Sequence, residues 1–332
     1  MSRTVFFHEL GDPEVMRLEE HHVAEPGPGE VLIRVDAIGL NRAEVLFRTG
    51  RYIEPVRRFP ATLGNEASGV VEAVGDGVTG VRVGQPVSTV PAFSQNDYGV
   101  YAERTVVPAA ALIRRPDELG PVEGAAVWMP YVTAYGALVE VGGMKPGDTV
   151  VLNAASSSVG LAAIQVANRV GATPIAVTRT ADKRETLRKE GAAAVIVTES
   201  EDVAERVRAV TGGRGAEFVF DAVAGSGVRD LASVVADGGL LLIYGALSGE
   251  PTPYPAIDLG MPPLNMRTYT MLETARDPER LRRAEAFVLS GLRSGALRPV
   301  VDRTFELEHM VEAHRYMESN VQIGKIVVTV SH

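Results

Sequence analysis

The chain has 332 residues, of which 45% are hydrophobic and 23% are charged, and its formal net charge is −9. A chain of this length is long enough for two domains, and its acidic balance argues against a nucleic-acid or anionic-membrane partner. It contains no cysteine, which excludes disulfides, thiolate nucleophiles, iron–sulfur clusters and cysteine zinc sites. Neither a signal peptide nor a transmembrane run is visible in the sequence, so we expect a cytoplasmic protein.

The first part of the chain has the pattern of a β-rich domain. Short apolar segments alternate with Gly- and Pro-containing turns, which predicts strands at 31–38, 69–75, 81–90 and 101–107. The C-terminal segment 324–330 also has strand character. We expect this last segment to rejoin the first domain.

The pattern changes at about residue 148, where strands and helices begin to alternate. Apolar strands are predicted at 149–153, 174–178, 194–197, 217–221 and 240–244, and helices at 159–170, 182–190, 202–210 and 228–236. Strands that are apolar throughout are typical of a parallel sheet covered on both faces. The segment therefore predicts a doubly wound α/β domain of the dinucleotide-binding type.

The turn after the first of these strands is a candidate phosphate site. It reads Asn153-Ala-Ala-Ser-Ser-Ser-Val-Gly160, and the three glycine positions of a G-x-G-x-x-G motif are Ala155, Ser157 and Gly160. Small side chains let backbone N–H groups and a helix N-terminus approach an anion, and serine adds a hydroxyl donor. The turn therefore predicts dinucleotide binding, although small-residue turns also open helices that bind nothing.

The end of the second strand indicates which dinucleotide is bound. No carboxylate stands at the strand tip, where an NAD site usually has one to bind the ribose 2′-hydroxyl. Instead, Arg179, Lys183 and Arg184 gather there with the hydroxyls of Thr178 and Thr180. A cationic, hydroxyl-lined tip suits a 2′-phosphate and favours NADPH. A solvated helix N-terminus with unrelated charges is the alternative.

The motifs together resemble one known family over nearly the whole chain. The sequence resembles the quinone oxidoreductase branch of the medium-chain dehydrogenase/reductase superfamily, through Gly64–Gly75, Thr133–Leu138, Ala155–Gly160, Phe220–Gly225 and Gly324–Val327. The resemblance implies a GroES-like substrate domain at 1–124, completed by 297–332, and a Rossmann NADPH-binding domain at 125–296. It also implies a homodimer.

The same resemblance makes zinc unexpected. Zinc-using relatives have His where this chain has Asn65, and their cysteine ligands are absent here. The resemblance therefore implies a metal-free enzyme in which Glu66 makes a structural hydrogen bond. Without a Lewis acid, reduction of an activated acceptor fits better than oxidation of an unactivated alcohol.

The resemblance implies two groups of site residues. On the substrate side it implies Asn41 and Tyr52 as hydrogen-bond donors and Thr133 as a hydroxyl near the nicotinamide amide. Packing of a loop is the alternative role of Tyr52, and a solvated surface position is the alternative for Lys325. The turn, the strand tip and the resemblance together predict these cofactor contacts: Ser156, Ser157, Ser158, Val159, Gly160, Thr178, Arg179, Lys183, Ala222, Tyr244, Gly245, Asn320 and Lys325.

The expected function is therefore a zinc-independent reductase that transfers hydride from NADPH to a quinone or to the C=C bond of an α,β-unsaturated carbonyl. A pathway-specific enoyl reductase or dehydrogenase acting on a bulky substrate is one alternative. A non-catalytic, crystallin-like NADPH-binding protein is another.

Overall fold

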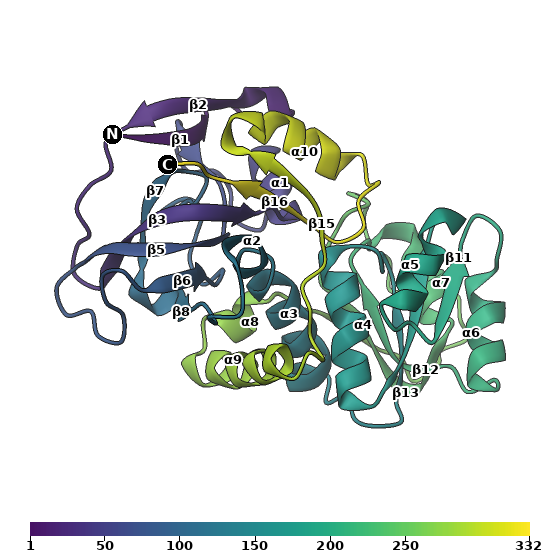
Figure 1. Cartoon of the computed structure of the whole chain (residues 1–332). Coiled ribbons are helices and arrows are strands. Elements are labelled where there is room, and N and C mark those ends of the chain that lie inside the picture. The colour runs from purple at the N-terminus through teal and green to yellow at the C-terminus, as the bar shows by residue number, and fades with distance from the viewer. The chain divides into compact units, whose positions relative to one another are not determined.

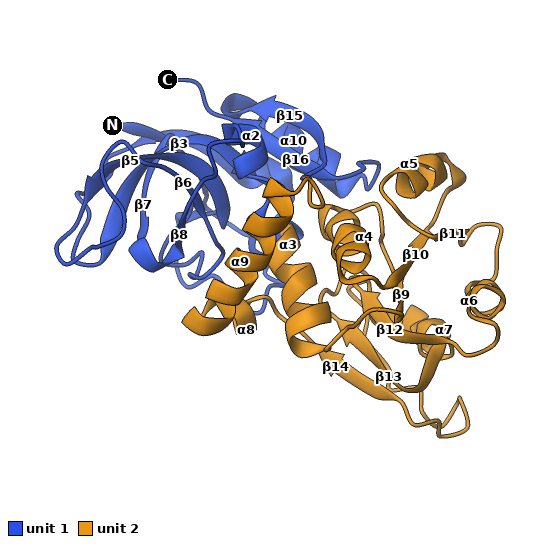
Figure 2. Ribbon diagram, turned by 60° about the horizontal axis from the view of Figure 1, so that its bottom comes forward, with its two compact units in different colours: residues 1–129, 299–332 blue, residues 130–298 orange.

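The computed structural model describes residues 1–332, which divide into two compact units. Unit 1 comprises Met1–Met129 and Pro299–His332, and unit 2 comprises Pro130–Arg298 (Figures 1 and 2). The boundary falls within helix α3 (Trp128–Tyr135), which a π-helical turn at Gly136–Val141 follows. No helix has the length and hydropathy needed to cross a membrane.

Unit 1 is built on two β-sheets. The larger has the strand order β15-β16-β3-β5-β6-β8 with β7 paired to β3, and the smaller has the order β2-β1-β4. The strands are β1 (Ser2–Phe7), β2 (Met16–His21), β3 (Glu30–Gly39), β4 (Ala61–Thr62), β5 (Glu66–Val74), β6 (Pro86–Thr89), β7 (Arg104–Pro108), β8 (Leu112–Arg114), β15 (Val301–Glu306) and β16 (Lys325–Thr329). The helices are α1 (Arg42–Arg48), α2 (Pro121–Gly124) and α10 (Met310–Glu318).

The C-terminal segment joins this unit, as the sequence predicts. Val327, Val328 and Thr329 of β16 pair antiparallel with β3, and α10 lies beside β15 and β16 (Figure 1). Alternate residues of β3 are buried, from Val31 through Ile33 and Val35 to Ala37, which is the period of a strand with one face on a core. This pairing brings residues from both ends of the chain into one sheet.

Unit 2 is a six-stranded parallel sheet flanked by helices (Figure 2). The strand order is β11-β10-β9-β12-β13-β14, the doubly wound order of a Rossmann fold, which reverses at β9. The strands are β9 (Thr149–Leu152), β10 (Thr173–Thr178), β11 (Ala194–Val197), β12 (Ala216–Asp221), β13 (Val235–Ile243) and β14 (Asn265–Thr268). The helices are α4 (Ser158–Val170), α5 (Arg184–Lys189), α6 (Val203–Thr211), α7 (Val228–Ala232), α8 (Leu272–Ala275) and α9 (Pro278–Arg293).

The structure corrects three of the predicted elements. The strand predicted at 81–90 is confined to β6, because Gly80 and Gly84 adopt positive φ angles of 87° and 82° and form a turn. The helix predicted at 228–236 stops at Ala232, because Val235 already pairs with Ala216 as the start of β13. A sixth strand, β14, extends the five predicted ones at the edge of the sheet.

Candidate active site

The predicted phosphate turn lies at the carboxyl end of β9 and leads into α4. Ser157 is the N-cap of α4, and its Oγ accepts a hydrogen bond of 3.1 Å from the Gly160 N–H. A hydroxyl also has one hydrogen to donate, so Ser157 can still donate to an anion. A Cβ on Gly160 would lie 2.5 Å from the Ala155 carbonyl oxygen, so the start of α4 can lie this close to the preceding turn only because residue 160 is glycine.

The switch point of the sheet, between β9 and β12, is held by one carboxylate. Asp221 is fully buried at the end of β12 and accepts hydrogen bonds from the Asn153 side chain (2.8 Å) and from the backbone N–H groups of Val223 (2.9 Å) and Ala224 (2.8 Å). Asp221 therefore orients the amides of the turn that follows β12. Dinucleotides bind at this position in doubly wound sheets.

Three predicted cofactor residues lie next to the switch point. Ala222 and Gly245 follow β12 and β13, and a Cβ on Gly245 would lie 2.6 Å from the Ala222 carbonyl oxygen. Tyr244 stacks on Phe220, with ring centroids 4.0 Å apart, and burial raises the pKa of its hydroxyl above the ordinary value. Tyr244 therefore remains a neutral hydroxyl across the physiological pH range.

The three cationic residues predicted at the tip of β10 differ in burial and in their partners. Lys183 is only 8% exposed, and its Nζ donates to the Ser156 Oγ of the phosphate turn at 3.2 Å. Arg179 is exposed next to the buried Thr178. Arg184 pairs at 2.6 Å with Glu201, a carboxylate that it shares with Arg206, and so points away from the phosphate turn to another partner. The structure thus brings Lys183 to the phosphate turn and leaves Arg179 at the rim.

A second cluster of site residues is buried in unit 1. Lys325, at the start of β16, is 1% exposed, and its Nζ donates to Glu66 Oε2 (2.5 Å) and Asn41 Oδ1 (2.6 Å). The other oxygen of Glu66 accepts from the Met129 N–H at 2.9 Å. Glu66 therefore makes the structural hydrogen bond expected of it. The alternative placement of Lys325 as a solvated surface lysine is wrong, because β16 directs it into the unit.

Glu44 completes this cluster. It is fully buried in the first turn of α1 and accepts from the N–H of Asn41, the N-cap residue, at 2.5 Å. Its second oxygen lies 3.4 Å from the side-chain amide nitrogens of Asn41 and Asn65. Burial raises the pKa of Glu44 to about 7, although Lys325 and the donors of Asn41 oppose the shift. Glu44 is thus a buried carboxyl that titrates near neutral pH.

The residues around Glu66 do not fit a zinc ion. Asn65 stands beside Glu66, Asn41 faces it across the cluster, and the Glu66 carboxylate is already ion-paired with the Lys325 ammonium. Zinc is held by thiolates, imidazoles and carboxylates. This set offers two amides, the Glu66 carboxylate, which Lys325 already neutralises, and the Glu44 carboxyl, which already accepts from Asn41 and Asn65. No group of three or more His, Asp or Glu side chains in the chain could hold a metal ion.

The remaining predicted residues lie elsewhere. Tyr52 follows α1, is partly buried and packs edge-on against Phe47, with centroids 6.2 Å apart. Thr133 is buried in α3. Asn320 adopts a positive φ of 62° just after α10, and its side-chain oxygen accepts from Arg42. The catalytic and cofactor-binding roles of these residues stay predictions.

Glu44 is the residue that the motifs above do not single out. A signal for it exists, because Asn41-Arg-Ala-Glu44 has the Asn-x-x-Glu spacing of a helix-capping box. Its full burial has no comparable signal in the sequence. Burial here depends on β5 and β16, which come from distant parts of the chain.

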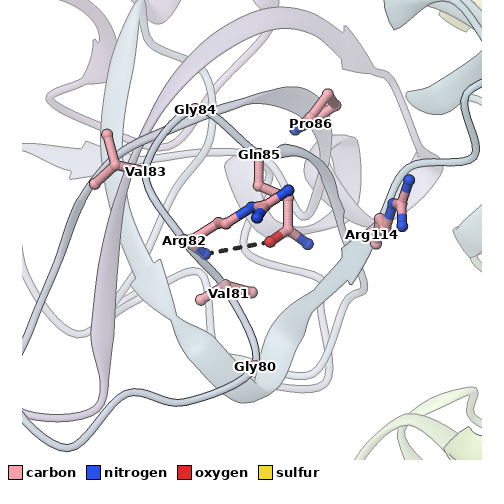
Figure 3. A pocket seen from close by; sticks show the side chains of 8 residues that line it. All are labelled: Gly80, Val81, Arg82, Val83, Gly84, Gln85, Pro86 and Arg114. Carbon is pink, nitrogen blue, oxygen red and sulfur yellow. Dashed lines mark hydrogen bonds between the residues drawn. The ribbon is translucent and has the colours of Figure 1, made fainter.

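One surface hollow lies away from both clusters. It has a volume of about 800 Å³ and is lined by the turn before β6 and by β8, and two of its lining side chains, Arg82 and Arg114, are cationic (Figure 3). The turn places Val81 and Val83 beside it, and none of the predicted site residues lines it. The hollow therefore takes no part in the site described above.

Comparisons with known proteins identify the family. Residues 27–117 match the alcohol dehydrogenase GroES-like domain, and residues 158–289 match the family described as zinc-binding dehydrogenase. The chain is 32% identical to a 2-haloacrylate reductase from Burkholderia sp. and 31% identical to a quinone oxidoreductase from Pseudomonas aeruginosa, and each match covers 99% of both chains.

A solved structure supports the same conclusion. The Escherichia coli quinone oxidoreductase, whose crystal structure is a complex with NADPH, matches 99% of this chain and 100% of its own with a TM-score of 0.92 at 28% identity. The sequence relatives and the GroES-like and Rossmann folds agree. The chain is therefore an oxidoreductase that belongs to the quinone oxidoreductase branch of the medium-chain dehydrogenase/reductase superfamily.

Proposed function

We propose that this protein is an NADPH-dependent, metal-independent reductase that transfers hydride to a quinone or to the C=C bond of an α,β-unsaturated carbonyl. The observation that carries the proposal is the ion pair between Lys325 and Glu66, which neutralises the carboxylate at the position where a metal would need it. An alcohol oxidation needs a stabilised alkoxide, whereas an electron-poor acceptor is already activated.

The choice of NADPH rests on the cationic tip of β10. Lys183 contacts the phosphate turn through Ser156, and Arg179 stands exposed beside it. Two cations at this place suit the extra phosphate of NADPH, since a charge-assisted hydrogen bond is about twice as strong as a neutral one. The E. coli relative in complex with NADPH supports the same choice.

When bound, the reduced nicotinamide supplies the hydride. The acceptor oxygen then gains negative charge, which hydrogen-bond donors must stabilise. Among the predicted substrate-side residues, Tyr52 and Thr133 carry hydroxyls that can donate, and Asn41 belongs to the buried cluster of unit 1. We propose these three residues as the catalytic set.

The C=C acceptor gains support from one relative. A 2-haloacrylate reductase is named for reduction of an activated alkene, and the match covers 99% of both chains. The quinone acceptor gains support from the relatives named quinone oxidoreductase. An acceptor panel containing both classes therefore decides between them.

We further propose that the protein is a cytoplasmic homodimer. Strand β14 is the edge of the sheet in unit 2, and the segment before it exposes three large apolar side chains: Tyr254 (63% exposed), Ile257 (83%) and Met261 (71%). Exposed apolar groups beside an unpaired edge strand are typical of a covered surface. Sedimentation of the purified protein tests the oligomeric state.

The function is tested by following NADPH oxidation spectrophotometrically with quinones, enones and haloacrylates, before and after exhaustive chelation. We expect turnover with at least one class and no loss of rate on chelation. Turnover of none of them, although NADPH binds by calorimetry, would favour the non-catalytic alternative. A single efficient bulky enoyl substrate would favour the pathway-specific reductase, and activity restored by zinc would contradict metal independence.

A further inference from the structure

The buried cluster of unit 1 holds three ionisable groups but only one cation. Glu44 and Glu66 are fully buried and Lys325 is 1% exposed, so none of the three is screened by bulk water. Burial of charges is costly unless each has a partner, and a cluster of this kind is retained for what it positions. Glu44 and Lys325 both contact the Asn41 side chain, and Glu66 holds Lys325 in place.

The hydrogen bonds of Asn41 can be counted one by one. Its Oδ1 accepts from Lys325 Nζ at 2.6 Å, and its Nδ2 lies 3.0 Å from the Gly39 carbonyl oxygen and 3.4 Å from Glu44 Oε1. Both amide hydrogens therefore point to oxygen atoms of the protein. The capping box of α1 turns the Glu44 N–H toward the Asn41 side chain, but Lys325 Nζ is the one donor that forms a hydrogen bond with Oδ1. A carbonyl oxygen can accept two hydrogen bonds, so Oδ1 alone has capacity left.

Lys325 fixes this orientation. Rotating the amide by half a turn would place the Asn41 NH₂ against the Lys325 ammonium and its oxygen against the Gly39 carbonyl and Glu44. Donor would face donor and acceptor would face acceptor in a buried site, which is costly. The rest of the unit makes room for the lysine, since a Cβ on Gly39 would lie 2.8 Å from Lys325 Cε and 1.9 Å from the Ala125 carbonyl oxygen.

We propose that Lys325 is a positioning residue for the reductase reaction: its buried ammonium, held by Glu66, locks the Asn41 side chain so that Asn41 presents an acceptor and not a donor to the bound reactants. The proposal rests on the reductase activity proposed above. It assigns Lys325 a role through Asn41 in place of direct contact with the cofactor.

The chemical consequence concerns the partner of Asn41. The Asn41 Oδ1 atom, polarised by the Lys325 ammonium, accepts a hydrogen bond from a hydroxyl or N–H group of a bound reactant. The same atom would repel an oxyanion that develops beside it. Asn41 therefore orients a donor group of the bound reactants, and the hydroxyls of Tyr52 and Thr133 are left as the proposed donors to the acceptor oxygen. This narrows the donor role that the sequence implies for Asn41.

The test uses a charge-balanced variant, because Lys325→Met alone would leave Glu66 unpaired. Lys325→Met is combined with Glu66→Gln, whose amide oxygen can still accept from the Met129 N–H. The matched control is Arg48→Met with Glu318→Gln, another pair in unit 1 with a fully buried cation. The measurements are kcat with the best acceptor, Kd for NADPH by calorimetry, and Tm.

We expect kcat of Lys325→Met/Glu66→Gln to fall at least tenfold while Kd for NADPH changes less than threefold. The control should lower Tm without lowering kcat. Asn41→Ala added to the charge-balanced variant should cause no further loss of kcat, because both changes remove the same interaction. A retained kcat, multiplicative losses, or a loss confined to the Kd for NADPH would overturn the positioning role.

A crystal structure of Lys325→Met/Glu66→Gln gives a readout that needs no turnover. We expect the Asn41 side chain to rotate or to occupy more than one conformer. An unchanged Asn41 conformer would overturn the inference even if the enzyme proved inactive with every acceptor. Absence of turnover in the wild-type protein, by contrast, would count against the proposed function alone.

Discussion

Each unit holds its own cluster of candidate site residues, and the two clusters are built from different groups. In unit 2 the site is mostly backbone: a turn, a helix N-terminus and strand ends whose amides are oriented by Asp221. In unit 1 it is a cluster of buried side chains in which Lys325 and Glu66 neutralise each other beside Asn41 and Glu44. A backbone site depends on small side chains and local geometry, whereas a side-chain site depends on charge balance over long sequence separations.

The largest predicted effect on the phosphate turn of unit 2 comes from adding one carbon atom to Gly160. In Gly160→Ala the new Cβ would meet the backbone of Ala155 at 2.5–2.6 Å, and backbone cannot move aside as a side chain can. We expect Kd for NADPH to rise about a hundredfold, or ~2.7 kcal/mol at ~1.4 kcal/mol per factor of ten. Calorimetric titration measures it. Gly227→Ala is the control, because its Cβ meets no atom within 4 Å, and equal affinities in the two variants would contradict the prediction.

A smaller effect should distinguish the contribution of Arg179, at the tip of β10, from that of the phosphate turn. Arg179→Ala removes an exposed charge at the tip of β10, and we expect KM for NADPH to rise about tenfold, since a charge-assisted hydrogen bond contributes about 1.5–3 kcal/mol. KM for NADH should not change, because NADH lacks the 2′-phosphate. Arg188→Ala, an exposed arginine of α5, serves as the control. An equal rise in KM for NADH and NADPH would contradict recognition of the 2′-phosphate by Arg179.

The smallest predicted effect concerns unit 1, where Glu44 and His314 change the stability of the fold with pH in opposite directions. Burial raises the pKa of Glu44 from 4.5 to about 7, so the folded protein keeps a proton that the unfolded chain has lost, and stability falls as pH rises through this range. Burial, aided by Arg48 and Arg42, lowers the pKa of His314 from 6.5 to about 3, so stability falls as pH drops below 6.5.

Between pH 4.5 and 6.5 the two slopes oppose each other, and each is at most about 1.4 kcal/mol per pH unit. We expect Glu44→Gln to lose stability more steeply than the wild type on acidification. His314→Gln should lose it less steeply, and its amide can still bond the Tyr101 hydroxyl that the ring nitrogen contacts at 3.0 Å. Urea unfolding at a series of pH values measures the slopes, and identical slopes in all three proteins would refute the assignment.

The candidate site residues of unit 2 can be named from the sequence because their signals are local. The strand, the turn at 153–160 and the helix follow one another directly, and the cations at the tip of β10 stand in a single short segment. The extent of α7 and the presence of β14 could not be read in the same way. Pairing with neighbouring strands decides both, and that information lies outside the segment.

In unit 1 the sequence identifies members of the cluster but not their arrangement. Asn41, Glu66 and Lys325 can each be named from motifs, yet their contact depends on β3, β5 and β16 meeting in one sheet. The sequence left open whether Lys325 was buried, and Glu44 was not singled out, because burial is a property of the assembled sheet. The family resemblance compensates for this only where a motif marks the residue.

The position of Lys325 in the last strand has a consequence for biosynthesis. Glu44 and Glu66 leave the ribosome well before the cation that neutralises their neighbourhood, because Lys325 follows Glu66 by 259 residues. Until then two carboxylates would have to be desolvated with no counter-charge, so the nascent β domain cannot close around them. A protein without β16 would therefore lose more than the strand that joins β15 to β3, because no cation would remain to neutralise the carboxylates buried in unit 1.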